Sequence, residues 1–226
     1  MSCIFYDAIG KGSFGKLIVK NTAGWAHLSL GDCMRAEITK KTDLGKAISS
    51  AMSEGRLVSD DLANDLAIQS INDLQLKNVP AVILDGYPRT LNQAIHFKEK
   101  FPHLDFQAVH IILEKWVAIE KTLGRQNCKT CGGSFNSADV LSDGYCMPAI
   151  VPNAATCPLG INCNPILEKR EDDTRETVEF RFNEIITKTS LLLDWYEERG
   201  ILKSFRVKKG LADVDMLTDL MNETAV

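Results

Sequence analysis

Short runs rich in apolar residues alternate with longer amphipathic segments along most of this chain. Five of these runs predict β-strands: Ile4–Tyr6, Ala26–Ser29, Val79–Leu84, Ala108–Leu113 and Ile201–Val207. Continuous apolar stretches such as Val82–Leu84 are typical of strands buried on both faces, which occur in parallel sheets covered by helices. The pattern therefore predicts an α/β fold with a three-layer core, in which helices cover both faces of a parallel sheet.

Two segments interrupt this alternation. Residues 31–60 predict short helices, with Asp32 as an N-cap and Gly55 in a turn. Residues 125–170 contain many glycines and prolines from Cys128 onward, which predicts turns in place of helices. The remaining residues, 1–30, 61–124 and 171–226, are expected to form the core.

From Glu171 the pattern predicts one long helix. Apolar residues recur there at helical spacing: Val178, Phe182, Ile185, Leu192 and Tyr196. Gly200 is expected to end this helix, because glycine readily adopts the left-handed conformation found after helix C-termini.

Composition excludes some classes of function. The chain has 226 residues, of which 45% are hydrophobic and 25% charged, and its net charge is −4. This balance is typical of a globular protein and argues against nucleic acid as a partner. No apolar run approaches ~18 residues, and no export signal is evident, so neither a membrane span nor secretion is predicted. We expect a cytoplasmic protein, with an organelle such as the mitochondrion as the open alternative.

A glycine-rich segment after the first predicted strand has the spacing of a phosphate-binding loop. Gly10 and Gly15 stand in a G-x-x-x-x-G-K pattern that Lys16 completes. In such a loop, backbone N–H groups surround a phosphate, the following helix adds its dipole, and the lysine adds a charge. The hydroxyl that normally follows the lysine is missing, because Leu17 and Ile18 stand there. Taken alone, this degenerate motif is equally compatible with a tight turn.

A second motif ends the most apolar of the predicted strands. Asp85 lies at the carboxyl end of that strand, where parallel sheets bind ligands and where a carboxylate can hold magnesium through water. Gly86 and Pro88 predict a turn that exposes Arg89 to an anion. The alternative for this segment alone is a turn with an exposed arginine.

Together these segments resemble the adenylate kinase family and related nucleoside monophosphate kinases. Asp85–Arg89 is similar to the family's D-G-[FY]-P-R signature, and Leu28–Arg35 is similar to its S-T-G-D-x-x-R segment. Further segments resemble the end of the family's monophosphate-binding insertion and the two sides of its mobile lid: Gly55–Asp60, Gly124-Arg125, Arg170–Asp173 and Thr177–Arg181. The matches occur in the family's order over essentially the whole chain, and the phosphate-binding loop is the weakest of them.

The resemblance implies a fold of the P-loop kinase type, with residues 31–60 as the helical monophosphate-binding insertion and residues 125–170 as the lid. It implies reversible phosphoryl transfer from ATP or GTP, with Mg²⁺, to AMP. We expect the protein to be a monomer. We also expect the reaction to be slow, because Leu17 and Ile18 remove the phosphate-binding hydroxyl. Replacing these two residues by Gly and Thr is expected to raise kcat. The alternative is a nucleotide-binding module with little or no turnover.

The resemblance also implies roles for individual residues. It places seven residues at the donor triphosphate: Gly10, Gly12, Ser13, Gly15, Lys16, Lys121 and Arg125. It places eight at the acceptor monophosphate: Leu30, Arg35, Val58, Gly86, Arg89, Gln93, Arg170 and Arg181. It implies catalytic roles for Lys16, Asp85, Arg89, Arg125, Arg170 and Arg181. Arginine suits these positions because its guanidinium matches two phosphate oxygens at once.

Within this set, Gln93 matches the family's reader of the acceptor adenine. Lys121 stands where the family usually has an arginine. A lysine there would act as a less directional point charge.

Five of the seven cysteines fall within residues 128–163. Cys128 and Cys131, followed by two glycines, form a knuckle of the kind that binds zinc. Zinc-bearing lids of the family have a second cysteine pair, and Cys163 is placed for it, with Cys157 as the expected partner and Cys146 as a competing ligand. Four thiolates would make a structural zinc site, which stabilises a segment too small to form its own core. Free or disulfide-bonded cysteines are the alternative.

Overall fold

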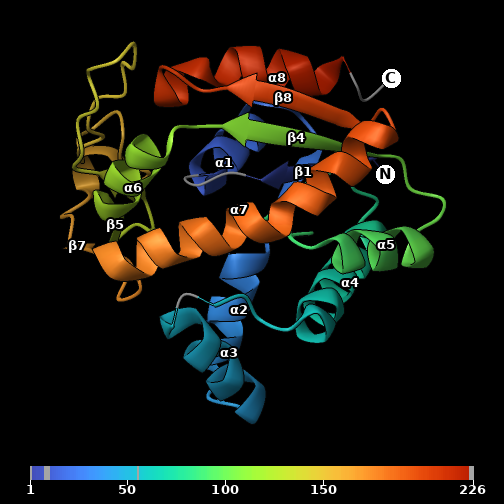
Figure 1. Ribbon diagram of the computed structural model, residues 1–226. Coiled ribbons are helices and arrows are strands. Elements are labelled where there is room, and N and C mark those ends of the chain that lie inside the picture. The colour runs from blue at the N-terminus through green and yellow to red at the C-terminus, as the bar shows by residue number, and fades with distance from the viewer. Residues whose placement is uncertain (1, 8–10, 55, 224–226) are drawn as a thin grey trace.

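The computed structural model describes residues 2–7, 11–54 and 56–223, and describes side chains from residue 13 onward. Its centre is a five-stranded sheet of order β2-β3-β1-β4-β8 in which every pairing is parallel (Figure 1). The strands are β1 (Ser2–Asp7), β2 (Trp25–Ser29), β3 (Ala81–Asp85), β4 (Phe106–Ile112) and β8 (Leu202–Arg206). All five predicted strands are confirmed.

Helices cover both faces of this sheet, as predicted. They are α1 (Lys11–Asn21), α4 (Asp60–Leu76), α5 (Leu91–Lys100), α6 (Lys115–Leu123), α7 (Arg175–Glu198) and α8 (Val214–Asn222), with a 3₁₀ turn η2 (Gly210–Asp213) before the last. The alternating side chains of β3 show the two faces: Val82 and Leu84 pack with α4, α5 and α7, whereas Ile83 packs with α1, α6 and α8. Every residue of β3 is buried, as expected for a central parallel strand.

Two helices project from the core below the sheet in Figure 1. They are α2 (Leu30–Thr39) and α3 (Asp43–Ser53), and they confirm the helices predicted for this insertion. The predicted cap is wrong, however. Ser29 is the N-cap of α2, because its Oγ accepts a hydrogen bond from Asp32 N at 3.4 Å, which places Asp32 in the first turn of the helix.

Residues 125–170 form the second projection, which is poor in helix as predicted. It contains a small antiparallel sheet of order β6-β5-β7, made of β5 (Arg125–Cys128), β6 (Ser134–Asn136) and β7 (Leu167–Glu168), and one 3₁₀ turn, η1 (Gly160–Asn162). Part of this segment packs on the core: Val140, Tyr145 and Met147 are at most 3% exposed and belong to the same apolar cluster as Val207.

The long helix predicted after Glu171 is α7, which crosses the front of the molecule in Figure 1. It ends at Glu198, and Gly200 follows with a φ of +66°, the left-handed conformation expected beyond a helix C-terminus. No helix within the described residues is both long enough and apolar enough to cross a membrane.

Candidate functional site

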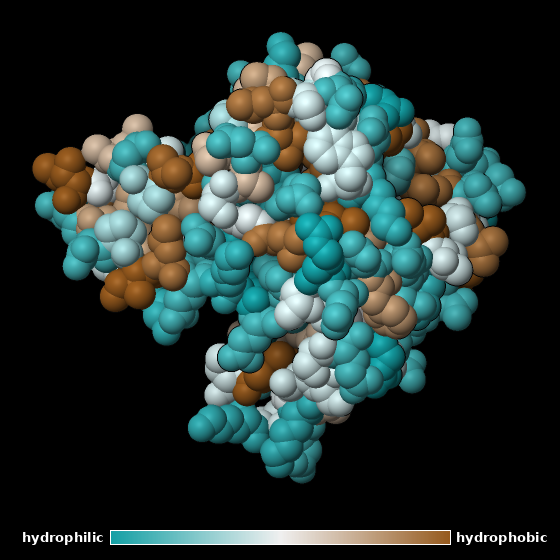
Figure 2. Space-filling view, turned by 60° about the vertical axis from the view of Figure 1, so that its left-hand side comes forward, coloured by the Kyte–Doolittle hydropathy of each residue, from teal (hydrophilic) through white to brown (hydrophobic). Residues whose placement is uncertain are grey.

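A cavity of about 700 Å³ opens at the carboxyl ends of the parallel strands. Ser29, Asp85, Leu113 and Val207, which lie at or just beyond the ends of β2, β3, β4 and β8, all line it. The surface is hollowed there between the two projections (Figure 2). This is the position at which open α/β sheets bind ligands, because the loops that follow the strands converge at that edge.

The cavity brings together most of the residues that the sequence assigned to a nucleotide site. The predicted residues that line it are Ser13, Lys16, Leu30, Arg35, Val58, Asp85, Gly86, Arg89, Gln93, Lys121, Arg125, Arg170 and Arg181. Gly15 is not among the lining residues, Gly10 lies outside the described residues, and Gly12 is described only as helical backbone. Residues from the core and from both projections thus reach one cavity.

The cavity concentrates positive charge although the whole chain is negative. Its described lining contains nine basic side chains: Lys16, Arg35, Arg56, Arg89, Lys121, Arg125, Arg170, Arg181 and Lys209. It contains three acidic ones: Asp32, Asp85 and Asp172. Arg56 and Lys209 were not predicted site residues, although Arg56 lies in the segment Gly55–Asp60 that resembles the end of the family's monophosphate-binding insertion. Such a surplus of cations suits a ligand that carries several negative charges.

Two arginines in the cavity lie against glycine backbone. A Cβ placed on Gly86, whose φ is +81°, would lie 3.1 Å from Nη2 of Arg89, and one on Gly31 would lie 3.3 Å from Nη2 of Arg35. Arg35 also forms an ion pair with Asp32. Nε of Arg89 is buried and has no hydrogen-bond partner among the described residues. A buried donor without a partner is costly, so an anion bound at Arg89 would satisfy it.

A second group of arginines lies at the base of the lid segment. Arg125 donates from Nε and Nη2 to both carboxylate oxygens of Asp173, at 2.9 and 2.5 Å, and Arg181 donates to Asp172 at 2.8 Å. Burial, together with repulsion from Arg125 and Arg35, lowers the pKa of Arg170 to about 10. Burial is the main cause and repulsion between the arginines the second, so a phosphate bound beside Arg170 would favour its charged form.

The predicted phosphate loop differs from expectation. Helix α1 begins at Lys11, so the segment from Lys11 to Lys16 is helical and not a turn. Ser13 and Lys16, one helical turn apart, still line the cavity. In a helix only the first four N–H groups lack intrahelical partners, so the N–H groups of Gly15 and Lys16 are not free for a phosphate. The expected cradle of N–H groups is therefore wrong for those two residues.

Gly15 instead packs closely against the sheet. A Cβ at this position would lie 2.4 Å from Cδ2 of His27, a distance that real contacts do not show. Glycine is thus required here by the approach of α1 to β2. The described contacts thus explain Gly15 by its packing against His27, whereas the sequence predicted a contact with the donor triphosphate.

The structure also contradicts the expectation that a threonine at position 18 would reach a phosphate. Ile18 is 0% exposed and packs with Phe14, Val117 and Leu217, and neither Leu17 nor Ile18 lines the cavity. Leu17 thus continues helix α1, and Ile18 belongs to the core.

We therefore expect the paired change Leu17→Gly with Ile18→Thr to destabilise the protein without raising kcat. Glycine in a helix costs about 1 kcal/mol, and loss of buried apolar surface with burial of a hydroxyl costs about 1–3 kcal/mol. Thermal and urea unfolding of the single and double variants would measure this loss. A double variant with unchanged stability and a higher kcat would contradict it.

One pair in the site had no signal in the local sequence. Nε2 of His27 lies 3.3 Å from Oδ2 of Asp85, and both side chains are at most 7% exposed. Neighbouring parallel strands bring the two residues together across 58 positions of sequence. His27 was assigned no chemistry from the sequence, because only the pairing of β2 with β3 shows its partner.

Lys121 also differs from its expected role. Its Nζ donates to the carbonyl oxygens of Ala138, Met147 and Pro148 at 2.7, 2.7 and 3.1 Å, which uses all three of its hydrogens. Burial lowers its pKa, against an opposing effect of Asp139. Lys121 lines the cavity but holds a turn of the lid segment, so in this structure it is not available to a triphosphate.

We expect Lys121→Met to loosen this turn. Within the turn, the backbone amides of Val140 and Met147 each donate to the carbonyl of the other residue, at 3.0 and 2.8 Å. In the variant these two amides should exchange with solvent at least tenfold faster. The reason is that hydrogen bonds from a charged donor, which the variant loses, contribute about 1.5–3 kcal/mol. Hydrogen exchange followed by mass spectrometry measures this. Lys115→Met is the matched control, because Lys115 is an exposed lysine of the same helix. Unchanged exchange with weakened binding of tripolyphosphate would instead restore the expected phosphate role.

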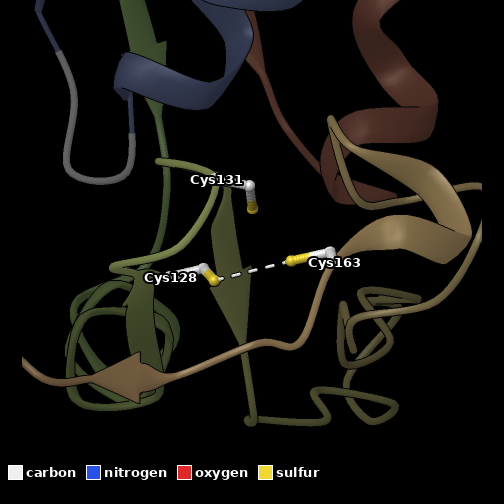
Figure 3. Close-up of side chains that lie close together, drawn as sticks. All are labelled: Cys128, Cys131 and Cys163. Carbon is white, nitrogen blue, oxygen red and sulfur yellow. Dashed lines mark hydrogen bonds between the residues drawn. The ribbon is translucent and has the colours of Figure 1, made fainter.

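Four cysteines converge in the lid segment. The Sγ atoms of Cys128, Cys131 and Cys163 all lie within 4.8 Å of one another and point toward a common centre (Figure 3). Sγ of Cys163 is 3.9 Å from that of Cys128, and Sγ of Cys157 is 3.4 Å from that of Cys131. Cys146, the competing ligand, is exposed and lines the cavity at the ends of the parallel strands.

The described cysteines, from Cys33 onward, are all free thiols, so the disulfide alternative is not found among them. Burial opposes ionisation of Cys128, but hydrogen bonds from Cys131 and from the backbones of Thr130 and Ile166 lower its pKa to about 6. A cluster of thiols that includes a readily ionised one has the chemistry of a zinc site, because the thiolate is the metal ligand.

Comparison with known proteins supports a nucleotide site. Residues 6–201 match the profile of the family described as adenylate kinase. The chain is 31% identical to a GTP:AMP phosphotransferase of Plasmodium falciparum, over 92% of this chain and 89% of that protein. It is 31% identical to an adenylate kinase of Borrelia turicatae and 33% identical to one of Listeria innocua, in each case over 91% of this chain and 90% of the relative.

Proposed function

Because the chain belongs to the adenylate kinase family, we propose that it is a nucleoside monophosphate kinase that transfers a phosphoryl group reversibly from ATP or GTP to AMP. The observation that carries this proposal is the cavity at the carboxyl ends of the strands, whose described lining contains nine basic and three acidic side chains. Phosphoryl transfer needs little covalent chemistry from a protein. It needs cations that position two nucleotides and stabilise charge on the transferred group.

In this proposal Arg35 and Arg89 hold the phosphate of AMP. Both guanidinium groups lie at the cavity wall against glycine backbone, and the buried Nε of Arg89 has no partner within the described residues. A phosphate provides several acceptor oxygens, which match the planar donor set of arginine. Gln93 also lines the cavity, accepts a hydrogen bond from the backbone N of Arg89, and is assigned to the acceptor base.

Arg125, together with Lys16 and Ser13 of α1, is proposed to act on the donor phosphates, and Arg170 and Arg181 are proposed to act where the transferred group meets the acceptor phosphate. Asp173 orients Arg125 through two hydrogen bonds and leaves three of its five donors available. Asp172 orients Arg181 through one. Pre-oriented cations stabilise developing charge without reorganising during the reaction. Lys121 is left out of this set for the reason given above.

Mg²⁺ fits this site because Asp85 supplies a carboxylate oxygen at the end of β3, while phosphate oxygens and water complete the usual donor set. Bound to the triphosphate, the ion would neutralise charge on the phosphates. His27, at 3.3 Å, is placed to fix the orientation of the carboxylate.

The cysteine cluster is proposed to bind one structural Zn²⁺ through Cys128, Cys131, Cys157 and Cys163. Zn–S bonds of about 2.3 Å in a tetrahedron place the sulfur atoms about 3.8 Å apart, close to the 3.9 and 3.4 Å of the two measured pairs. Four protein ligands leave no open position for catalysis, so this metal would stabilise the lid segment.

The proposed division of the chain follows the two projections. Residues 31–60 form the monophosphate-binding insertion, 125–170 form the lid, and the rest forms the core. Closing of both over bound nucleotides would exclude water and so prevent hydrolysis. We also propose that the protein is a cytoplasmic monomer; the free thiols support only the reducing compartment.

A coupled assay of ADP formation tests the function, with ATP or GTP as donor, AMP as acceptor and Mg²⁺ present. Transfer that requires both nucleotides supports the proposal and identifies the donor base, which relatives of both kinds leave open. The second candidate, a binding module without turnover, is favoured by the helical start at Lys11 and the buried Ile18. Binding of AMP without transfer would establish the module.

A further inference from the structure

A set of polar groups around Gln93 goes beyond the roles proposed so far. Gln93 is only 3% exposed, yet it lines the nucleotide cavity. Its Oε1 accepts a hydrogen bond from Arg89 N at 2.7 Å, and its Nε2 donates to Oδ1 of Asp60 at 2.8 Å. Both ends of the side-chain amide are therefore held by groups of the protein.

These two contacts allow only one orientation of the amide. A backbone N–H can only donate, and a carboxylate can only accept. Turning the amide over would place its NH₂ against the N–H of Arg89 and its oxygen against the carboxylate of Asp60. Leaving buried donors and acceptors without partners in this way is expensive, so the turned orientation is excluded.

Asp60 is itself fixed by a second contact. Thr90 caps α5 by accepting from Gln93 N at 3.2 Å, and its Oγ1 donates to Oδ2 of Asp60 at 3.0 Å. The two oxygens of Asp60 thus join the start of α4 to the start of α5. Asp60 also lies close enough to affect Tyr87. Burial raises the pKa of the Tyr87 hydroxyl, and the negative charge of Asp60 raises it further.

The fixed amide retains one N–H and one lone pair. Adenine presents an acceptor at N1 beside donor hydrogens at N6, whereas hypoxanthine and guanine present the opposite pattern, a donor at N1 beside an acceptor at O6. A glutamine that can turn over accommodates either pattern. A glutamine that cannot turn accommodates only one of them when the phosphate of the nucleotide is held in place.

We propose that Asp60 sets the base specificity of the acceptor site by holding the amide of Gln93 in the orientation that pairs with adenine. The proposal rests on the proposed function, since it takes AMP as the acceptor and Gln93 as the group that meets its base. Asp60 is then a positioning residue. It does not line the cavity and acts through Gln93.

The test compares binding of AMP and of IMP by isothermal titration calorimetry, without a donor nucleotide. We expect the parent protein to prefer AMP and Asp60→Ala to lower the ratio of AMP to IMP affinity at least tenfold, because a site built to hydrogen-bond one edge strongly rejects another. Asp60→Asn keeps an oxygen for Gln93 and should fall between the two. The matched control is Asp61→Ala, since Asp61 is the next residue in the same first helical turn and is exposed.

Three results would overturn the inference. A parent protein that binds IMP as tightly as AMP has no such specificity. Equal weakening of AMP and IMP by Asp60→Ala would show a structural role only. Tighter AMP binding by this variant would show that Asp60 competes with the base for Gln93. If circular dichroism shows that Asp60→Ala does not fold, the ratio in Asp60→Asn decides: a fall supports the inference, and no change overturns it.

The outcome is separable from that of the proposed function. Preference for AMP that depends on Asp60 supports the inference even if no phosphoryl transfer is detected, in which case only the proposed activity fails. Transfer to AMP with a ratio that is insensitive to Asp60 overturns the inference and leaves the activity intact.

Discussion

Arg89→Ala is expected to weaken AMP binding by about 30-fold to several thousandfold and to abolish most transfer. Removal of one member of a buried, hydrogen-bonded charge pair costs about 2–5 kcal/mol, and Arg89 is the cavity arginine with a buried Nε that lacks a partner within the described residues. The loss should appear in both KM for AMP and kcat, because the arginine also positions the phosphate whose oxygen attacks the transferred group. Calorimetric titration with AMP and the coupled assay measure the two effects.

The fold should survive this change, because Arg89 forms no ion pair in the described structure and its guanidinium lies at a cavity wall. Thermal unfolding within a few degrees of the parent would confirm that. Arg175→Ala serves as the control: Arg175 is an exposed arginine that pairs with Glu120 and Glu179 outside the cavity. If Arg89→Ala bound AMP as the parent does, Arg89 would not be a phosphate ligand.

The second large effect is expected from the cysteine cluster. Protein purified without chelator should contain about one zinc per chain, and Cys157→Ser should lose it, because Sγ of Cys157 lies 3.4 Å from that of Cys131. Apparent binding energies of structural zinc reach about 10–16 kcal/mol in small domains, so its removal should also unfold the lid segment. Elemental analysis measures the metal, and limited proteolysis within residues 129–168 measures the unfolding.

Cys146→Ser is the matched control for this experiment. Cys146 belongs to the same segment but is exposed, and it should leave both zinc content and proteolysis unchanged. Zinc that remains in Cys157→Ser but is lost in Cys146→Ser would show that the ligand set is wrong. Absence of zinc from the parent protein, with the same resistance to protease, would show that hydrogen bonds alone hold the segment.

The sequence was sufficient for the architecture because a buried parallel strand has a local signature. The apolar run that became β3 and the helical spacing that became α7 each depend on residues close together in sequence. The arginine positions were also predictable, since the motifs that contain Arg35, Arg89, Arg125, Arg170 and Arg181 follow the family's order. The structure places all five at one cavity.

Local spacing failed where an element boundary depended on packing. The segment from Lys11 has the spacing of a phosphate loop, yet it is helical, and Ile18 is fully buried beside Phe14 and Val117. Burial of these side chains against the sheet favours continuing the helix over the turn that the glycines would allow. In the same way Ser29, not Asp32, caps α2, because the end of β2 sets where that helix begins.

Only the tertiary structure decided which partner each polar group meets. The pairing of β2 with β3 brings His27 to Asp85, the lid turn brings three carbonyls to Lys121, and the packing of α4 on α5 brings Asp60 to Gln93. The physical reason is range. The hydrophobic period that forms a strand or helix acts over a few residues, whereas a hydrogen bond depends on distances of about 3 Å between groups that the fold brings together from distant parts of the chain.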